Sequence, residues 1–256
     1  MCTLTFAWRA FADAPLVVAA NRDELLDRAS EPPIVEDGDP TFLAPRDAVS
    51  GGTWIGYNER GVFAGITNRW VTVPDGGERS RGRLVRDVLR AESAAAARET
   101  VESAVASDTY DGFNLVVADG RDDGRDGPAA YLFEWDGDLR VRRLDPGVHV
   151  VVNVGVDGEY VEPEWNPETG PIQAHDAERI LADLAPEDFE TPTAWRDRAV
   201  DILRDHDYGV CVHEPDRDFG TRSSSVLLFS ADGDVEFHFA DGPPCETAFE
   251  RVESQV

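Results

Sequence analysis

The order of hydrophobic patterns along the chain is the feature that most restricts its fold. Strand-type stretches fill the first seventy residues, among them "CTLTFAW", "LVVAANRD" and "GTWIGYNERGVFAGITN", and the last predicts a hairpin with its turn near residues 58–61. The proline-rich segment 31–47 between them is expected to be a loop. Further patterns predict helices at 79–107, 174–184 and 192–205 and strands within 113–155 and 223–241. This order predicts an α+β layered fold in one domain, residues 1–256, and argues against a doubly wound parallel sheet.

Surface charge restricts the partners. The chain carries 51 acidic and 24 basic residues, a formal net charge of -27, and every basic residue is an arginine. Molar salt shortens the Debye length to about 3 Å, so dense carboxylates repel one another little there and keep the protein hydrated. The composition indicates a halophilic protein. An acidic face for a basic partner is the alternative, although the acids are spread along the chain. Nucleic acid is not expected as a partner, because its phosphates would be repelled.

The expected location of the protein follows from its hydropathy. No apolar run approaches the roughly 20 residues needed to span a bilayer, and the first residues lack the basic start and cleavage site of a secretory signal. We expect a cytoplasmic protein with no membrane span that takes a small-molecule substrate or ligand. These patterns do not predict the oligomeric state.

Cys2 directly follows the initiator methionine, and this position matters chemically. Cysteine is small enough for an aminopeptidase to remove Met1, which would leave a thiol and a free α-amine on one residue. An α-amine has a pKa of about 7.7 to 8.0 and can therefore accept the thiol proton without a histidine. Nucleophile and base would then belong to the same residue. The alternative is a buried cysteine in an edge strand.

Residue spacing does not predict a metal site. Cys2, Cys211 and Cys245 are far apart and form no CxxC pair, and the five histidines form no HxxxH pair. His213 lies two residues after Cys211, but a metal there would need more ligands than the neighbouring residues offer. We therefore expect no disulfide framework, no bound metal and no cofactor for a hydrolytic function.

The chain resembles the NRDE family, the transport and Golgi organisation protein 2 group, in several blocks. They are "MCT", "ANRDE", "GGTWIGYNERGVFAGITN", "SRGRLV" and "YGVCVHEPDRDFGTRSSSVLLF", which span nearly the whole chain. The acidic composition indicates a haloarchaeal-type member. A weaker likeness connects these blocks to choloylglycine hydrolases and penicillin V acylases. That likeness implies a four-layer αββα sandwich of the N-terminal nucleophile (Ntn) hydrolase type.

The same resemblance implies catalytic roles for four residues. Cys2 would be the nucleophile, and Asp23 would hydrogen-bond its α-amine. Asn68, at the end of "GVFAGITN", would donate its amide to the tetrahedral oxyanion, and loss of such a donor typically costs about 3 to 4 kcal/mol. Asn153, in "HVVVNVG", would orient either the substrate carbonyl or the amine. Each asparagine alone could simply end a strand; their occurrence together with Cys2 and Asp23 favours the catalytic interpretation.

Three further residues are assigned to substrate binding, namely Asn21, Arg22 and Arg222. The amidases carry arginine immediately before the asparagine of their Asn-x-Asp motif, whereas this chain has Ala20 there and Arg22 inside the motif. Side chains alternate along a strand, so Asn21 and Asp23 should share one face and Arg22 the other, which leaves a salt-bridge role open for Arg22. Arg222, in "GTRSSS", is a second candidate to hold an anionic substrate group or Asp23.

Two functions follow from these observations. The first is an N-terminal cysteine amidohydrolase that cleaves a small or medium acyl amide through a Cys2 thioester. The second is a non-catalytic carrier of haem or a lipid-type ligand, because the eukaryotic side of the NRDE family is implicated in secretory organisation and haem movement. A haem carrier would need an axial ligand that faces a large apolar cavity, for which Cys2, Cys211 and His213 are the candidates.

Overall fold

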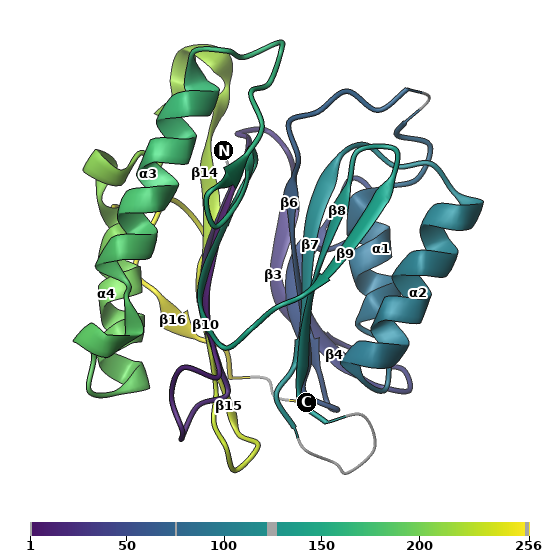
Figure 1. The fold of residues 1–256 in the computed structure, drawn as a ribbon, viewed down its shortest axis with the longest axis vertical. Coiled ribbons are helices and arrows are strands. Elements are labelled where there is room, and N and C mark those ends of the chain that lie inside the picture. Colours follow the sequence, from purple (N-terminus) through teal and green to yellow (C-terminus); the bar gives the residue numbers. More distant parts are fainter. Residues whose placement is uncertain (1, 75, 122–126, 254–255) are drawn as a thin grey trace. The chain divides into compact units, whose positions relative to one another are not determined.

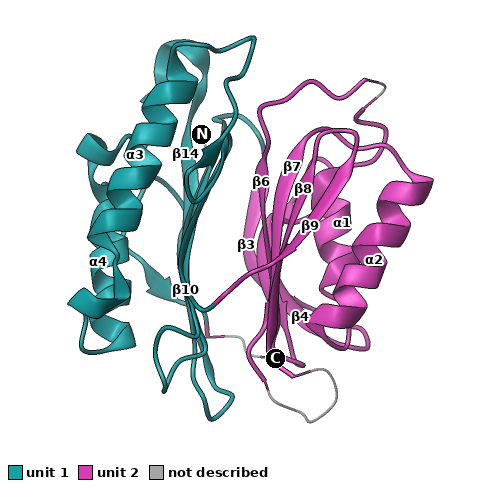
Figure 2. Cartoon of the chain, in the orientation of Figure 1, with its two compact units in different colours: residues 1–28, 146–252 teal, residues 29–145, 253–256 magenta. Residues whose placement is uncertain are grey.

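The described strands form two antiparallel sheets, and each sheet belongs to a different compact unit of the chain (Figures 1 and 2). The computed structural model describes residues 2–74, 76–121, 127–253 and 256, so Met1 lies outside the described residues. Unit 1 comprises residues 1–28 and 146–252, and unit 2 comprises residues 29–145 and 253–256. The assignment of one domain to residues 1–256 stays a prediction.

Unit 1 is built on a nine-stranded sheet in the order β12-β11-β10-β1-β2-β14-β15-β16, with β13 paired to β14. Its long central strand β2 pairs with β1 on one side and with β14 on the other, and this pairing brings together segments from both ends of the chain. The strands are β1 (Thr3–Trp8), β2 (Leu16–Leu25), β10 (Gly147–Val152), β11 (Gly155–Val156), β12 (Glu159–Tyr160), β13 (His213–Glu214), β14 (Phe219–Phe229), β15 (Val235–Ala240) and β16 (Glu250–Arg251).

Two helices pack on one face of the unit 1 sheet, α3 (Thr169–Asp183) on β10 and α4 (Pro192–Arg204) on β2 and β14 (Figure 1). Helix α4 begins where its sequence indicates, because Thr191 caps it by accepting a hydrogen bond from the Ala194 N–H at 3.1 Å and Pro192 occupies the first turn. Three short 3₁₀ helices complete the unit: η1 (Pro186–Asp188), η2 (His206–Tyr208) and η3 (Pro215–Arg217).

Unit 2 is built on a seven-stranded sheet in sequential order from β3 to β9, with α1 and α2 packed on one face. The strands are β3 (Ser30–Glu36), β4 (Phe42–Asp47), β5 (Ile55–Asn58), β6 (Val62–Asn68), β7 (Phe113–Asp119), β8 (Ala129–Trp135) and β9 (Leu139–Arg143). The helices are α1 (Arg81–Val88) and α2 (Ala94–Ser107), and their buried side chains join those of the sheet in one apolar core. This unit therefore repeats the plan of unit 1, an antiparallel sheet with two helices on one face.

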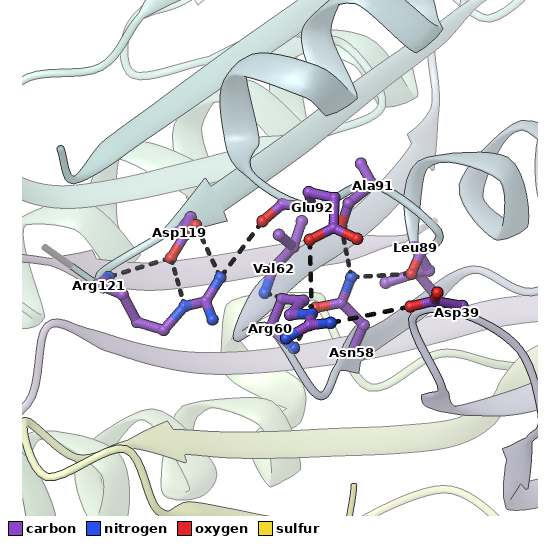
Figure 3. Close-up of polar contacts among 9 residues, drawn as sticks. All are labelled: Asp39, Asn58, Arg60, Val62, Leu89, Ala91, Glu92, Asp119 and Arg121. Atoms are coloured by element: carbon purple, nitrogen blue, oxygen red, sulfur yellow. Dashed lines mark hydrogen bonds and ion pairs between the residues drawn. The ribbon is translucent and has the colours of Figure 1, made fainter. Parts of the chain in front are cut away.

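One buried asparagine, Asn58, fixes the β5–β6 hairpin of unit 2 (Figure 3). Its Oδ1 accepts hydrogen bonds from the Arg60 and Val62 N–H groups, both at 3.0 Å, which closes the turn. Its Nδ2 donates to Leu89 O at 2.9 Å and to Ala91 O at 2.8 Å, at the end of α1. The side chain thus satisfies carbonyls that the helix leaves unpaired and ties the helix end to the hairpin.

Most of the predicted elements are confirmed. The hairpin turn lies at residues 59–61 between β5 and β6, and the helical region 79–107 contains α1 and α2. The loop predicted at 31–47 is wrong, because this segment contains most of β3 and β4. Strand β3 lies at the edge of its sheet and its register shifts between Glu31 and Ile34, where Pro32 and Pro33 stand. An edge strand accepts proline there, because the ladder loses no hydrogen bond that it needs.

Candidate active site

The backbone nitrogen and the sulfur of Cys2 both contact other elements of unit 1. Cys2 immediately precedes β1 and is half-buried. Its backbone nitrogen donates to Asn153 Oδ1 at 2.8 Å, and its Sγ lies 3.6 Å from the backbone oxygen of Asp23. The sheet therefore brings together the start of β1, the end of β2 and the turn after β10, which are predicted site positions separated by up to 151 residues.

The orientation of Asn153 is fixed by a residue that sequence reasoning missed. Gln173, buried on α3, donates from Nε2 to Asn153 Oδ1 at 3.2 Å. The Gln173 Oε1 accepts from the Val154 N–H at 3.1 Å. The glutamine side chain therefore bonds both to the side-chain oxygen of Asn153 and to the backbone N–H of the next residue. Asn153 Oδ1 therefore faces the Cys2 nitrogen. Of the two roles predicted for Asn153, this geometry fits orientation of the amine.

Asp23 lies near the end of β2 and is only 4% exposed. Its Oδ1 accepts a hydrogen bond from the Thr221 hydroxyl of β14 at 2.6 Å. Burial raises the pKa of the Asp23 carboxyl above its ordinary value of 3.8, although the Thr221 hydrogen bond acts in the opposite direction. Burial, and next the charge of Asp23, also raise the pKa of the Cys2 thiol above 9.0. Both effects favour the protonated thiol over the thiolate.

The register of the sheet determines which side chains share a face with Cys2. Thr3 pairs with Asn21, so Cys2, one residue earlier, lies beside Arg22, and Arg22 in turn pairs with Ser223 of β14. The predicted alternation of Asn21 and Arg22 is thus observed, and it places the arginine on the same face of the sheet as Cys2. Arg22 is 6% exposed, and its Nη2 lies 3.6 Å from Glu24 Oε2. The predicted salt bridge of Arg22 is present, and the sheet register places Arg22 beside Cys2.

Asn21, whose predicted role in substrate binding stays a prediction, is hydrogen-bonded within the protein. Its Nδ2 donates to Leu203 O at 3.0 Å and to Val210 O at 2.8 Å, and its Oδ1 accepts from the Ser224 hydroxyl at 2.6 Å. These contacts use both N–H groups of the amide. The reason is its face of the strand, which is turned toward α4 and the segment after it. We therefore interpret Asn21 as an anchor for residues 203–210.

Arg222 lies at an irregular point of β14. The pairing with β2 shifts between Thr221 and Ser223, so Arg222 is the extra residue of a β-bulge. Its side chain is partly exposed, while its Nε is buried and makes no hydrogen bond to any described residue. A bulge redirects a side chain out of the regular pleat. Thr221 pairs with Asp23, and Ser223 pairs with Arg22. The Nε of Arg222, which has no hydrogen-bond partner among the described residues, therefore belongs to the residue between these two.

Asn68, the predicted oxyanion donor, belongs to unit 2. It is the last residue of β6, it pairs with Phe113 of β7, and it is exposed. Its part in the chemistry of Cys2 stays a prediction. The other predicted site residues, Cys2, Asn21, Arg22, Asp23, Asn153 and Arg222, all belong to unit 1.

A cavity of about 310 Å³ lies elsewhere in unit 1, against α4 and the strands β14 and β15. Its walls combine charged and apolar side chains, which are Arg196, Asp197, Val200, Asp201, Arg204, Val226, His238 and Phe249. No candidate catalytic residue and no candidate haem ligand lines it. The cavity and the predicted chemistry therefore do not coincide.

Solved structures with the same fold are Ntn hydrolases. The Caenorhabditis elegans N-acylethanolamine-hydrolyzing acid amidase ortholog has a TM-score of 0.57 at 14% identity, over 89% of this chain and 92% of that one. Penicillin V acylase from Agrobacterium tumefaciens has a TM-score of 0.52 at 13% identity, over 98% of both chains. The chain therefore has the fold of the N-terminal nucleophile hydrolases, and the predicted α+β fold class is confirmed.

Within that fold class, the chain belongs to the transport and Golgi organisation 2 family, whose model matches residues 1–239. The transport and Golgi organization protein 2 homolog of Bos taurus is 29% identical over 244 residues, which are 87% of this chain and 84% of that protein. The predicted family resemblance is thus confirmed. No helix in the described part of the chain has the length and hydropathy needed to cross a membrane.

Proposed function

We propose that this protein is an N-terminal cysteine amidohydrolase that cleaves a small or medium acyl amide through a thioester on Cys2. One observation supports this above the others: the Cys2 nitrogen donates to the oriented oxygen of Asn153 at 2.8 Å while its sulfur lies beside Asp23. The two named amidases of the same fold give the proposal its reaction class.

The first half of the reaction uses the two functional groups of Cys2. Removal of Met1 turns the Cys2 nitrogen into an α-amine, of which one N–H bonds to Asn153 and the lone pair accepts the thiol proton. The sulfur bonds to the amide carbonyl carbon, and the α-ammonium passes the proton to the leaving nitrogen as the C–N bond breaks. The raised pKa of the thiol, which burial causes, makes this base necessary.

The second half hydrolyses the thioester. The α-amine takes a proton from water, the hydroxide bonds to the acyl carbon, and the C–S bond breaks with return of the proton to sulfur. The products are one carboxylic acid and one amine, and Cys2 is restored. Asn68 is the proposed donor to the oxyanion in both halves. Arg222 and Arg22 are proposed to bind a polar or anionic end of the substrate, because the Arg222 Nε has no partner among the described residues.

The test separates the thiol from the amine. In molar salt, Cys2→Ala should lower amine release from a panel of acyl amides by about 10⁴-fold, because the nucleophile is lost. A cleavable N-terminal extension should lower it similarly with the thiol intact, and its removal to leave Cys2 first should restore activity. Intact mass must show that Met1 is absent from the active protein.

His175→Ala on the exposed side of α3 serves as the control and should keep full activity. Amide hydrolysis that survives in Cys2→Ala would rule out the thioester. Full activity of the extended protein before cleavage would rule out the α-amine as base.

A further inference from the structure

Four side chains of metal-binding type gather in unit 1, and none of them takes part in the chemistry proposed above. His206, Cys211, His213 and Cys245 each offer one ligand atom, and these atoms lie within 4.8 Å of one another. Cys211 Sγ is 3.4 Å from Cys245 Sγ and 3.6 Å from His213 Nε2, and His213 Nε2 is 3.2 Å from Cys245 Sγ. We call these four residues the thiol–imidazole cluster.

Three separate segments bring the cluster together. Cys211 lies two residues before His213, which begins β13, and their ligand atoms lie 3.6 Å apart. His206 begins η2, and its ring centroid lies 5.1 Å from that of His213. The fourth ligand comes from the turn at residues 243–247, which two hydrogen bonds to Pro243 O close. The spacing near Cys211 shows only two ligands, so it predicts no metal, and the fold supplies the other two.

We propose that the thiol–imidazole cluster binds one structural zinc ion. Two thiolates and two imidazoles are a common ligand set for tetrahedral structural zinc, and four protein ligands leave no open position for catalysis. With Zn–S of about 2.3 Å and Zn–N of about 2.0 to 2.1 Å, the edges of a tetrahedral site are about 3.4 to 3.8 Å. The three separations among Cys211, His213 and Cys245 are 3.2 to 3.6 Å. Only His206 must move toward the ion by a small amount, and its exposed side chain permits this.

A disulfide and a loosely attracted cation both fit the cluster less well than zinc does. A disulfide would bring the two sulfurs to about 2.0 Å and would use neither histidine, whereas the observed 3.4 Å is a ligand–ligand distance. Loose attraction of cations to a chain of net charge -27 would involve the surface carboxylates, and no carboxylate belongs to this cluster. Cys211 is buried and the other three ligands are exposed, so the site has both a fixed ligand and an entry path for the ion.

The cluster is connected to the candidate active site by one hydroxyl group. Thr221 Oγ1 accepts from the Val212 N–H at 2.8 Å, between the two cluster residues of that segment, and donates to Asp23 Oδ1 at 2.6 Å. Asn21 holds the same segment through Val210 O. Zinc would therefore clip the segment 206–213 to the 243–247 turn and hold the group that orients Asp23. The zinc proposal stands on the cluster geometry alone and does not require hydrolase activity.

The test is metal analysis of the full-length protein, purified in molar salt with a reductant and dialysed against a weak chelator. We expect one zinc per chain by elemental analysis and native mass spectrometry. Replacement by cobalt(II) should give the visible absorption of a tetrahedral thiolate site. Cys245→Ser and His213→Ala, both at exposed positions, should weaken zinc binding at least about 100-fold, judged by competition with a chromophoric chelator.

Cys2→Ala and His175→Ala remove one thiol and one imidazole outside the cluster and should keep one zinc each. The variants are compared at equal folded fraction by circular dichroism. Zinc far below one per chain in the wild type would overturn the proposal, as would full zinc retention in Cys245→Ser. A mass two hydrogens below that of the thiol form, with Cys211 linked to Cys245 and no metal bound, would identify a disulfide instead.

Discussion

Each unit of the molecule ties a helix end to a strand with one buried asparagine, Asn21 in unit 1 and Asn58 in unit 2. Both donate from Nδ2 to two backbone carbonyls, those of Leu203 and Val210 in one case and Leu89 and Ala91 in the other. Their oxygens differ in partner. Asn58 Oδ1 accepts two N–H groups of its own turn, whereas Asn21 Oδ1 accepts a hydroxyl from the neighbouring strand β14.

This difference gives the two buried asparagines different roles. The Asn58 network closes on itself within a hairpin and one helix end, so its consequence is stability (Figure 3). The Asn21 network holds the segment that contains Val212, whose N–H bonds to the hydroxyl that orients Asp23. The same tie is therefore purely structural in unit 2 and supports the candidate site in unit 1.

Low salt should produce the largest difference in stability between the two units. Unit 1 has 28 acidic and 10 basic residues, a net charge of -18, whereas unit 2 has 23 and 14, a net charge of -9. Self-repulsion should therefore open unit 1 first, because single surface ion pairs return only about 0 to 1 kcal/mol. Hydrogen exchange during a stepwise change from molar to millimolar KCl should show β2 and β14 losing protection before β6 and β7. Simultaneous loss would contradict the charge argument, and unchanged protection throughout would contradict a halophilic protein.

Replacement of the two asparagines should sharpen the comparison. Asn58→Ala removes the partners of two N–H groups and two carbonyls and should lower the free energy of unfolding by about 3 to 5 kcal/mol. Asn21→Ala leaves two carbonyls and one hydroxyl without their partner and should lower the free energy of unfolding by about 2 to 4 kcal/mol. Denaturant unfolding in molar salt measures both values.

The location of the damage distinguishes the two ties. Faster hydrogen exchange should be confined to residues 203–213 in Asn21→Ala and to residues 58–62 and 89–91 in Asn58→Ala. Loss of protection at residues 203–213 in Asn58→Ala would show that the two networks are not separate.

The smallest change in stability is expected when one buried carboxylate in each unit is replaced by an amide. The sign of this change should differ between the units. Burial raises the pKa of Asp23, so the native state keeps that proton longer than the unfolded chain. Stability that depends on this group is therefore highest below the unfolded pKa and falls as the pH rises through the folded pKa. Asp23→Asn, which keeps an acceptor for Thr221, should gain stability relative to the wild type as the pH rises from about 4.

Asp47→Asn in unit 2 is the matched control. Asp47 is also buried, but its Oδ1 accepts from the Val49 N–H at 2.9 Å and the Ser50 N–H at 3.2 Å, so its neutral replacement should lower stability at neutral pH. Thermal unfolding between pH 4 and 8 compares the two. A parallel response of both variants would remove the distinction between them.

Local patterns were sufficient to predict many of the elements. Thr191 followed by Pro192 marks the start of α4, and Asn58 to Gly61 marks the hairpin turn, where Gly61 adopts a positive φ of 74°. The prolines of 31–47 misled the prediction, because a segment reads as a loop unless one knows that its strand lies at a sheet edge.

Tertiary pairing explains the rest. The alternation of Asn21 and Arg22 is visible in the sequence, but which of them faces Cys2 depends on the pairing of Thr3 with Asn21. Gln173 is a lone glutamine on a helix, and nothing in its neighbourhood indicates that it orients Asn153. The thiol–imidazole cluster joins residues 206, 211, 213 and 245, a spacing that matches no short metal motif.

The discontinuity of unit 1 has a consequence for synthesis on the ribosome. The contacts that place Cys2, Asp23 and Asn21 span 151, 198 and 203 residues, and loops of this length close late and at an entropic cost. In the sequence, almost all of unit 2 falls between the two segments of unit 1. The unit 2 sheet can therefore assemble while β14 is still untranslated. Cys2 thus reaches its place only after the late segments of unit 1 have been made. Under the proposed function, this interval is when an aminopeptidase would remove Met1.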